Sequence, residues 1–339
     1  MTFVSRPTFE RCPSTVLAAL LSGLFVGPAL AQTHFESNIN ALGAYLPSGS
    51  EDYVYGGDVV SVAGATPQGL VRVIADPNPG MLPYNGYAEG WSRVDVAGVH
   101  VYAHSLSTAS PDIGMRSYSS VAASGFFSDF FSLNVPGYAP GTVFSVTALV
   151  RSDGSVSADS NPSSDGFFHA NQASALAYWE SWVRVIGAGE TALAEIRARE
   201  DCAEFSTFGH GASCTSSGSV GLGTMTFSLV NGGAPVQLDL RGFVQAAGSA
   251  NNLAGGTAEG EAFADMANTI AWGGISTLRD ASGAAVDEFS AFSATSGFDY
   301  RYSYGAPVAA VPEPENAALL LAGLALMGAF VRRRRGAAA

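Results

Sequence analysis

The sequence predicts an all-β protein: an antiparallel β-sandwich or jelly-roll-like body flanked by an N-terminal signal helix and a C-terminal transmembrane helix. Three observations support the β class. Short runs of β-branched residues show at least partial apolar–polar alternation, turn-forming residues separate these runs, and only 13% of the residues are charged while 40 are glycine. This composition favours short strands and many turns over long helices stabilised by charge pairs.

The expected strands recur along the whole central part of the chain. Turn signals with Pro-Gly, Asp-Gly or Asn-Gly pairs lie between them, and this arrangement is typical of a sandwich or jelly roll. The runs occupy residues 58–63, 70–74, 94–102, 142–150, 224–230, 236–243 and 258–270.

The segment 173–203 fits two structures. Small or apolar residues alternate with charged ones over 192–200, as in a strand. The composition nevertheless favours a helix, in which Glu195 and Arg199 would form a favourable pair one turn apart. We interpret the segment as strand because of the alternation.

The first 31 residues have the three parts of a secretory signal peptide. Arg6 and Arg11 supply the positive start, residues 16–26 form an apolar run, and Ala29 and Ala31 place small residues where signal peptidase cleaves. Cleavage after Ala31 would leave residue 32 as the mature N-terminus. We therefore expect an exported protein.

Charge in the body is strongly acidic. Lysine is absent, so all 16 basic residues are arginine, and residues 32–311 hold 10 of these against 26 Asp and Glu, a net charge of 10 − 26 = −16. Such a field repels phosphate backbones, which argues against nucleic-acid binding.

Cysteine usage agrees with export. Cys12 lies in the signal peptide, which leaves Cys202 and Cys214 as the two body thiols. In an oxidising compartment we expect them to form a disulfide. A structural zinc site would need four ligands, and only His210 lies between the two cysteines.

The C-terminal segment combines three features. Val311, Pro312, Glu313 and Pro314 form an extended acidic motif, an uninterrupted apolar stretch covers 317–331, and four arginines follow it. The stretch is short for a bilayer, at about 22 Å as a helix, yet its large apolar residues cover all faces and leave no polar stripe. The four arginines should keep the C-terminus cytoplasmic and the body outside; they are Arg332, Arg333, Arg334 and Arg335.

This segment resembles the PEP-CTERM sorting tail of Gram-negative bacteria, with motif, apolar helix and Arg cluster in the family's order. The resemblance implies recognition by an exosortase-type transpeptidase in the inner membrane and a link to exopolysaccharide or biofilm matrix. Residues 263–270, 280–283 and 296–300 are also similar to the last strands that precede the tail in such proteins. The expected organisation is a signal peptide (1–31), an exported body (32–305), a linker with the sorting motif (306–316), a transmembrane helix (317–331) and a cytoplasmic Arg-rich tail (332–339).

Two groups of polar residues are candidates for metal binding or catalysis. His100, Tyr102 and His104 would share one face of a strand, but a third metal ligand is not evident in the sequence, so we interpret them as an exposed polar face. A glycosidase needs two carboxyls about 5–10 Å apart across the sugar. Adjacent acids such as Glu259 with Glu261, or Asp287 with Glu288, are interpreted as solvated surface.

Motifs for nucleophilic, zinc-hydrolytic or nucleotide chemistry are absent from the sequence: it has no G-x-S-x-G, H-E-x-x-H, P-loop or C-x-x-C. We assign no catalytic residue, no cofactor and no metal. The tryptophans could form a sugar-stacking platform, although most aromatic residues of a sandwich lie in the core. They are Trp91, Trp179, Trp182 and Trp272.

The favoured hypothesis is a non-catalytic protein of the cell surface or extracellular matrix that passes through the inner membrane and associates with exopolysaccharide. Its expected partners are signal peptidase, an exosortase-type transpeptidase, the membrane and polysaccharide. The alternatives are a secreted polysaccharide-active hydrolase and a carbohydrate-binding adhesin.

Overall fold

The computed structural model describes residues 33–46, 54–76, 86–109, 116–163, 171–187, 191–207, 212–252 and 257–304. Every regular element in these ranges is a β-strand, and all strand pairs are antiparallel. The all-β prediction is confirmed. The predicted signal helix and transmembrane helix lie outside the described residues, and within those ranges no helix is long and apolar enough to span a bilayer.

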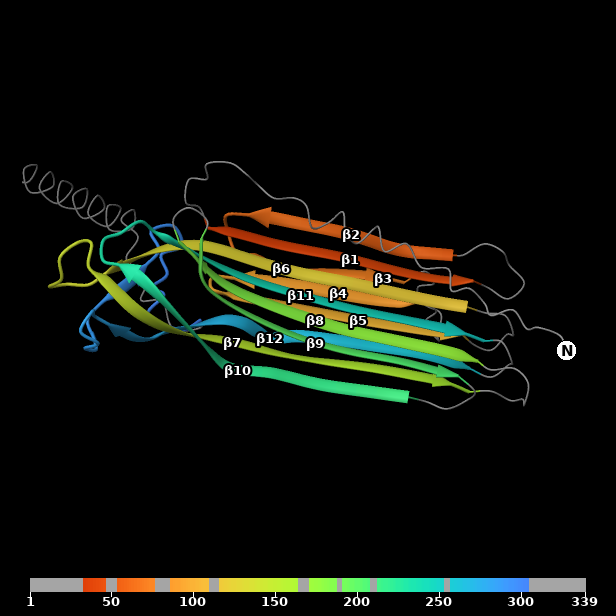
Figure 1. The fold of residues 1–339 in the computed structure, drawn as a ribbon. Coiled ribbons are helices and arrows are strands. Elements are labelled where there is room, and N and C mark those ends of the chain that lie inside the picture. Colours follow the sequence, from red (N-terminus) through yellow and green to blue (C-terminus); the bar gives the residue numbers. More distant parts are fainter. Residues whose placement is uncertain are drawn as a thin grey trace, which may run out of the picture.

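Two long sheets pack face to face (Figure 1). Sheet A has the order β2-β1-β6-β11-β8-β9, with β13 added to β6, and sheet B has the order β10-β7-β12-β5-β4-β3. The strands of sheet A are β1 (His34–Leu46), β2 (Val54–Gly64), β6 (Arg116–Asn134), β8 (Gln172–Ile186), β9 (Ala192–Thr207), β11 (Val236–Asn251) and β13 (Ser290–Phe292). Those of sheet B are β3 (Gln68–Ala75), β4 (Tyr87–Asp95), β5 (Gly98–Ala109), β7 (Val143–Pro162), β10 (Ala212–Val230) and β12 (Ala258–Arg279).

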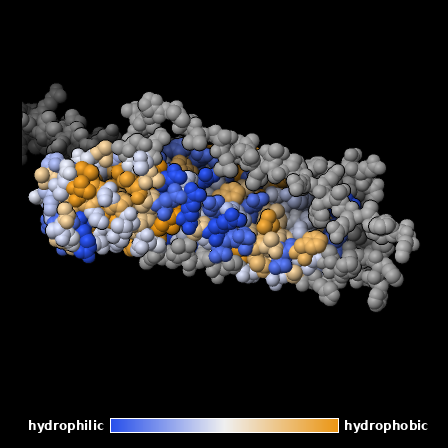
Figure 2. All heavy atoms as spheres, viewed as in Figure 1, coloured by the Kyte–Doolittle hydropathy of each residue, from blue (hydrophilic) through white to orange (hydrophobic). Residues whose placement is uncertain are grey.

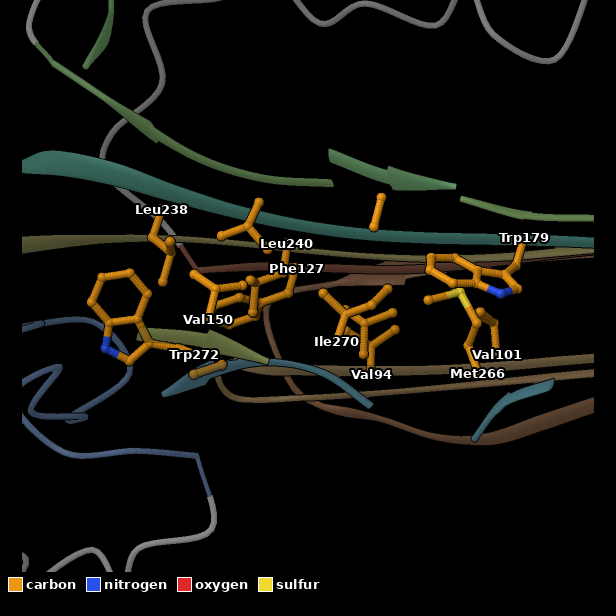
Figure 3. Packing of buried hydrophobic residues seen from close by; sticks show 14 of the residues in the cluster. Val94, Val101, Phe127, Val150, Trp179, Leu238, Leu240, Met266, Ile270 and Trp272 are labelled. Carbon is orange, nitrogen blue, oxygen red and sulfur yellow. The ribbon is translucent and has the colours of Figure 1, made fainter. Parts of the chain in front are cut away.

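Strict alternation creates the space between the sheets. In β11, for example, every second residue is buried along all 16 positions. The inner residues of both sheets form one core, in which Trp179, Leu240 and Phe127 of sheet A face Trp272 and Ile270 of sheet B (Figure 3). A strand rises about 3.3 Å per residue, so the 22 residues of β12 extend roughly 70 Å and give the sandwich its elongated form (Figure 1).

The core changes in character along this length. The largest buried side chains lie toward one end, which also holds Asp129 and the last described residues; we call it the tail pole. Toward the opposite end, the far pole, small residues replace them, and a separate cluster consists of Ala109, Ala250 and Ala258. A Cβ added at Gly248 would lie 2.5 Å from the carbonyl oxygen of Gly260, so the two sheets approach here as only glycine permits.

Buried serines accompany the small residues toward the far pole. The hydroxyl of Ser119 on sheet A lies 2.7 Å from that of Ser105 and 2.8 Å from that of Ser107, both on sheet B. Ser107 also donates to the carbonyl of Gly248 at 2.8 Å. These bonds satisfy the buried hydroxyls of Ser105, Ser107 and Ser119, which would otherwise destabilise the core.

One expected strand is divided in the structure. Residues 94–102 were predicted as a single strand, but β4 ends at Asp95, β5 begins at Gly98, and the two form a hairpin. Ala97 adopts a positive φ of 59° in the connecting turn. Alanine is an uncommon residue for that conformation, so the sequence gives no turn signal there.

The ambiguous segment 173–203 is strand, as interpreted. It forms most of β8 and β9, which pair with each other. Glu195 and Arg199 therefore do not meet one helical turn apart. Glu195 instead accepts hydrogen bonds from Arg184 on β8, at 3.2 Å, and from Arg197 on its own strand, at 2.5 Å.

Candidate functional site

A buried carboxylate holds the two ends of the body together at the tail pole. Asp129 points inward from β6 and is 0% exposed. It lies in the short stretch Phe126–Phe131, where an acidic residue interrupts an aromatic sequence. Four hydroxyls donate to its two oxygens: Thr33 at 2.9 Å, Ser293 at 3.0 Å, Ser296 at 2.6 Å and Tyr300 at 2.6 Å. We call these five residues the Asp129 cluster.

The cluster connects distant parts of the chain. Thr33 is the first described residue, and Ser293, Ser296 and Tyr300 belong to the last described segment. Burial, followed by the charge and hydrogen bond of Asp129, raises the pKa of Tyr300 well above its usual value. The Tyr300 phenol therefore stays protonated and acts as a donor.

A second set of contacts fixes the point from which the C-terminal segment leaves the body. The Tyr304 hydroxyl donates to Asp95 at 2.9 Å and lies 3.1 Å from Nε2 of His100. Because that hydroxyl uses its proton toward Asp95, its oxygen accepts from an Nε2–H of His100. The Tyr304 ring lies over Gly98, where an added Cβ would come within 2.5 Å of the ring. The backbone N–H of Tyr304 donates to the carbonyl oxygen of Trp272 at 2.8 Å.

These contacts set the distance from the body to the sorting motif. Burial, and then the hydrogen bond to Asp95, raises the pKa of Tyr304 to about 12. Val311 lies seven positions after Tyr304 in the sequence, a span of at most about 25 Å for an extended chain. Any enzyme that recognises the motif therefore acts close to the tail pole.

The outer face of sheet B carries a compact group of aromatic and charged side chains. His100, Tyr102 and His104 project from this face of β5, as the spacing predicted. The Trp91 ring stacks on Tyr102, with centroids 5.7 Å apart and planes at 16°, and His104 stacks on Phe263 at 4.1 Å and 10°. We call the following residues the outer-face cluster: Arg72, Tyr87, Glu89, Trp91, Tyr102, His104, Glu261 and Phe263.

Polar contacts hold this cluster in place. Arg72 on β3 and Tyr87 on β4 each donate to Glu89 at 2.6 Å, and His104 lies 3.0 Å from Glu261 on β12. Burial disfavours the charged form of Glu89, but the two hydrogen bonds outweigh it and the pKa of this carboxyl is lowered. Burial and the nearby acids raise the pKa of Tyr102 to about 12.

The acidic residues do not form the opposed pair that a glycosidase needs. Glu259 and Glu261 project from the same side of β12, two residues apart. Burial, together with Glu261 and Asp159, raises the pKa of Glu259. Asp287 and Glu288 lie between β12 and β13. Within the described ranges, no group of three or more His, Cys, Asp or Glu residues is arranged to hold a metal ion.

The four tryptophans divide between core and surface. Trp179 and Trp272 are buried between the sheets, whereas Trp91 lies on the outer face of sheet B and Trp182 on that of sheet A. The guanidinium of Arg184 lies 3.9 Å from the centre of the Trp182 ring, and that of Arg197 lies 5.0 Å from it. Hydrophilic residues gather around the middle of this face of sheet A, over β6, β11 and β8 (Figure 2).

A disulfide joins the two sheets at one side of the sandwich. Cys202 of β9 and Cys214 of β10 are bonded, with 5.9 Å between their Cα atoms, as expected from their being the only body thiols. β9 ends sheet A and β10 ends sheet B, so the bond ties together the two edge strands on that side.

The remaining predicted site residues lie outside the described residues: Ala29 and Ala31, the motif Val311–Pro314, and Arg332–Arg335. Residues 310–335 match a family model described as the PEP-CTERM protein-sorting motif. The chain carries a PEP-CTERM sorting motif. The match includes both the Val311–Pro314 motif and the Arg cluster, and the rest of the chain matches no family model. The PEP-CTERM motif indicates an exported protein that is processed by an exosortase.

No curated protein has a sequence that matches this chain. Among solved structures, a chain in the structure of the infectious bursal disease virus Gx strain is 9% identical in sequence. The match covers 71% of this chain and 65% of that chain, with a TM-score of 0.11. The Gt strain of the same virus is 10% identical, with coverages of 87% and 73% and a TM-score of 0.12. This chain thus spans about 65% of the length of the first of these. Likenesses at such TM-scores carry no argument about fold or function.

Sequence reasoning missed the Asp129 cluster and the Tyr304 contacts. A usable signal for the first was present, since in a strand Asp129 shares one face with Phe127 and Phe131. The partners of Asp129 are 96 to 171 residues distant in sequence, and no local pattern connects them.

Proposed function

We propose that this PEP-CTERM protein is an exported surface or extracellular-matrix protein, non-catalytic, which passes through the inner membrane and then associates with exopolysaccharide. The observation that carries the proposal is the sorting motif at 310–335, directly after a folded β body. In this account, signal peptidase removes residues 1–31, the 317–331 helix holds the protein in the inner membrane, and an exosortase-type transpeptidase acts at Val311–Pro314.

The position of the Asp129 cluster supports this order of events. Both the first and the last described residues meet at the tail pole, so the signal peptide and the sorting tail would connect to the same end of the body. A body held in this way would extend away from the membrane by its long axis (Figure 1). Release of the tail would then free the body without any change in its fold.

A double substitution tests the sorting step. Pro312→Ala with Glu313→Ala removes the extended acidic motif but leaves the apolar stretch and the Arg cluster intact. We expect this variant to be exported and to accumulate in the inner membrane, while the parent and a matched Pro307→Ala control move to the surface or medium. A plain membrane anchor would give all three proteins the same location.

The outer-face cluster favours a more specific role, in which the body binds polysaccharide directly. Sugar rings pack on aromatic side chains, and their hydroxyls bond to fixed carboxylates and guanidinium groups. Trp91 and Tyr102 would supply the aromatic surface, and the Arg72–Glu89 pair and the His104–Glu261 pair would supply oriented polar groups.

Binding to a glycan array tests this role. Trp91→Ala combined with Tyr102→Ala should abolish binding by the intact body, whereas Trp182→Ala, on the outer face of the other sheet, should leave it unchanged. Equal loss in both variants, or glycan binding that survives the double substitution, would exclude the outer-face cluster as the binding surface. The sorting proposal stands independently of this result.

A further inference from the structure

The aromatic rings on the outer faces of the two sheets have different surroundings. On sheet A, arginine covers them: the guanidinium groups of Arg184 and Arg197 lie 3.9 Å and 5.0 Å from the centre of the Trp182 ring. Both arginines also donate to the carboxylate of Glu195. On this face, the chain therefore supplies its own cation to a surface made of an aromatic ring and a carboxylate.

On the outer face of sheet B, the described part of the chain supplies no such cation. The Trp91 ring stacks on Tyr102, and within the described ranges no guanidinium group lies over either ring. The arginines of β3 and β4 are each bonded to a carboxylate, Arg72 to Glu89 at 2.6 Å and Arg93 to Asp95 at 2.9 Å.

Further carboxylates border the two rings. Asp265 on β12 lies directly opposite Tyr102, and Glu261 lies directly opposite Asp159 on β7. Like charges on facing residues of neighbouring strands destabilise a sheet. Within the described ranges, no arginine forms an ion pair with Asp159, Glu259 or Glu261. We call these three residues and Asp265 the acidic track.

The acidic track affects the titrating groups beside it. Burial, and then repulsion from Glu261 and Asp159, raises the pKa of the Glu259 carboxyl. Burial and three nearby carboxylates, that of Asp265 among them, raise the pKa of Tyr102 to about 12. Both shifts disfavour additional negative charge, and a positively charged ligand would relieve the same repulsion.

We propose that the polysaccharide bound by the outer-face cluster is built from amino sugars whose amino groups are free and positively charged. This inference rests on the proposed polysaccharide role of the cluster and adds the chemical class of the sugar. An ammonium group beside Trp91 and Tyr102 would make a cation–π contact, and Asp265 or Asp159 would supply an ion pair. The ligand would then have the place that arginine has at Trp182. A sugar that carries carboxylates would be repelled instead.

The acidic track is long enough for several such contacts. Its acids on β12 extend from Glu259 to Asp265, six residue steps or about 20 Å along the strand. Amino groups that recur along one polysaccharide chain would engage these carboxylates together, and the linkage between them raises the overall affinity. The acidic body would also attract a cationic chain at long range.

Two oligosaccharides that differ only at nitrogen test this substrate class. The probes are a glucosamine oligomer with free amino groups and its fully N-acetylated form of equal length. Each is titrated into the exported protein in mild detergent at about pH 6, where the amines are protonated and ordinary carboxyls are ionised. We expect the free-amine form to bind about tenfold more tightly, and this preference to weaken as added salt screens the charges.

A double substitution locates the effect at the acidic track. Asp159→Asn combined with Asp265→Asn keeps the size of both side chains but removes two charges, and it should weaken binding of the free-amine form about tenfold. Affinity for the N-acetylated form should stay as in the parent. The matched control makes the same change in net charge on sheet A, through Asp58→Asn with Asp201→Asn at two exposed positions, and should alter neither affinity. Unchanged circular dichroism spectra would show that both variants are folded.

Equal affinity for the two oligomers, or an equal loss in the site variant and the control, would overturn the amino-sugar proposal. Absence of binding to both oligomers would overturn it as well. If other glycans still bind in a way that depends on Trp91 and Tyr102, the polysaccharide role stands and only the sugar class is wrong. If no glycan binding depends on these two rings, the polysaccharide role of the cluster is wrong too.

Discussion

The Asp129 cluster makes a strong prediction for the substitution Asp129→Asn. The amide can keep its oxygen as acceptor for Thr33 and Ser293, but it places an N–H₂ group where Ser296 and Tyr300 now donate at 2.6 Å. Each lost hydrogen bond to a charged group costs about 1.5–3 kcal/mol. Rotation of the hydroxyls recovers part of this loss, and removal of a buried charge recovers more, so we expect a net destabilisation of about 3 kcal/mol.

Urea unfolding followed by tryptophan fluorescence measures this effect where it occurs. The indole N–H of Trp272 donates to the carbonyl of Tyr300 at 2.7 Å, so its emission reports on the same part of the core. The matched control is Asp159→Asn, an exposed acid on β7, which should change the free energy of unfolding by no more than about 0.5 kcal/mol. Amide exchange should accelerate in residues 290–304 of Asp129→Asn alone.

Equal stability of Asp129→Asn and Asp159→Asn would refute this reasoning. So would a gain in stability in Asp129→Asn, because the cost of burying the carboxylate would then exceed what its four hydroxyl partners provide.

Two further predictions concern the disulfide and the partly buried phenols of Tyr102 and Tyr304. Replacing Cys202 and Cys214 together by serine should lower the free energy of unfolding by about 3 kcal/mol on the chain-entropy estimate, and free thiols in the exported parent would contradict the bond itself. The pKa values of Tyr102 and Tyr304 are raised to about 12 from an ordinary value of 10.0, so the folded state keeps both phenols protonated. Their contribution to stability should be complete below pH 10 and should be lost as the pH rises toward 12. Phenolate absorbance, compared between the parent and Tyr304→Phe, should show a late-titrating group, and titration of that group near pH 10 would contradict the contacts described.

Sequence reasoning predicts the class of this fold well because alternation is a local property. The inner and outer faces of β11 follow directly from its two-residue period, and the same period identified β9 as strand despite its helix-favouring composition. The order of the strands within each sheet could not be predicted, since it depends on contacts between residues that are far apart in the chain. The β4–β5 turn was missed because Ala97 adopts a conformation usually associated with glycine or asparagine.

The candidate sites show the same division between local and distant information. The shared face of His100, Tyr102 and His104 followed from spacing alone, but their partners did not. Glu261 is 157 residues from His104, and Tyr304 is 204 residues from His100. The sorting motif, in contrast, is contained in one continuous segment, which is why both the residues and the family model identify it.

Processing at the sorting motif is tested most directly by the intact mass of the protein recovered from the cell surface or the medium. We expect a chain that begins at residue 32 and ends before the apolar stretch at residue 317, with the Cys202–Cys214 bond intact. A recovered protein that still contains residues 317–335 would contradict processing at the PEP-CTERM motif and would leave only a membrane anchor.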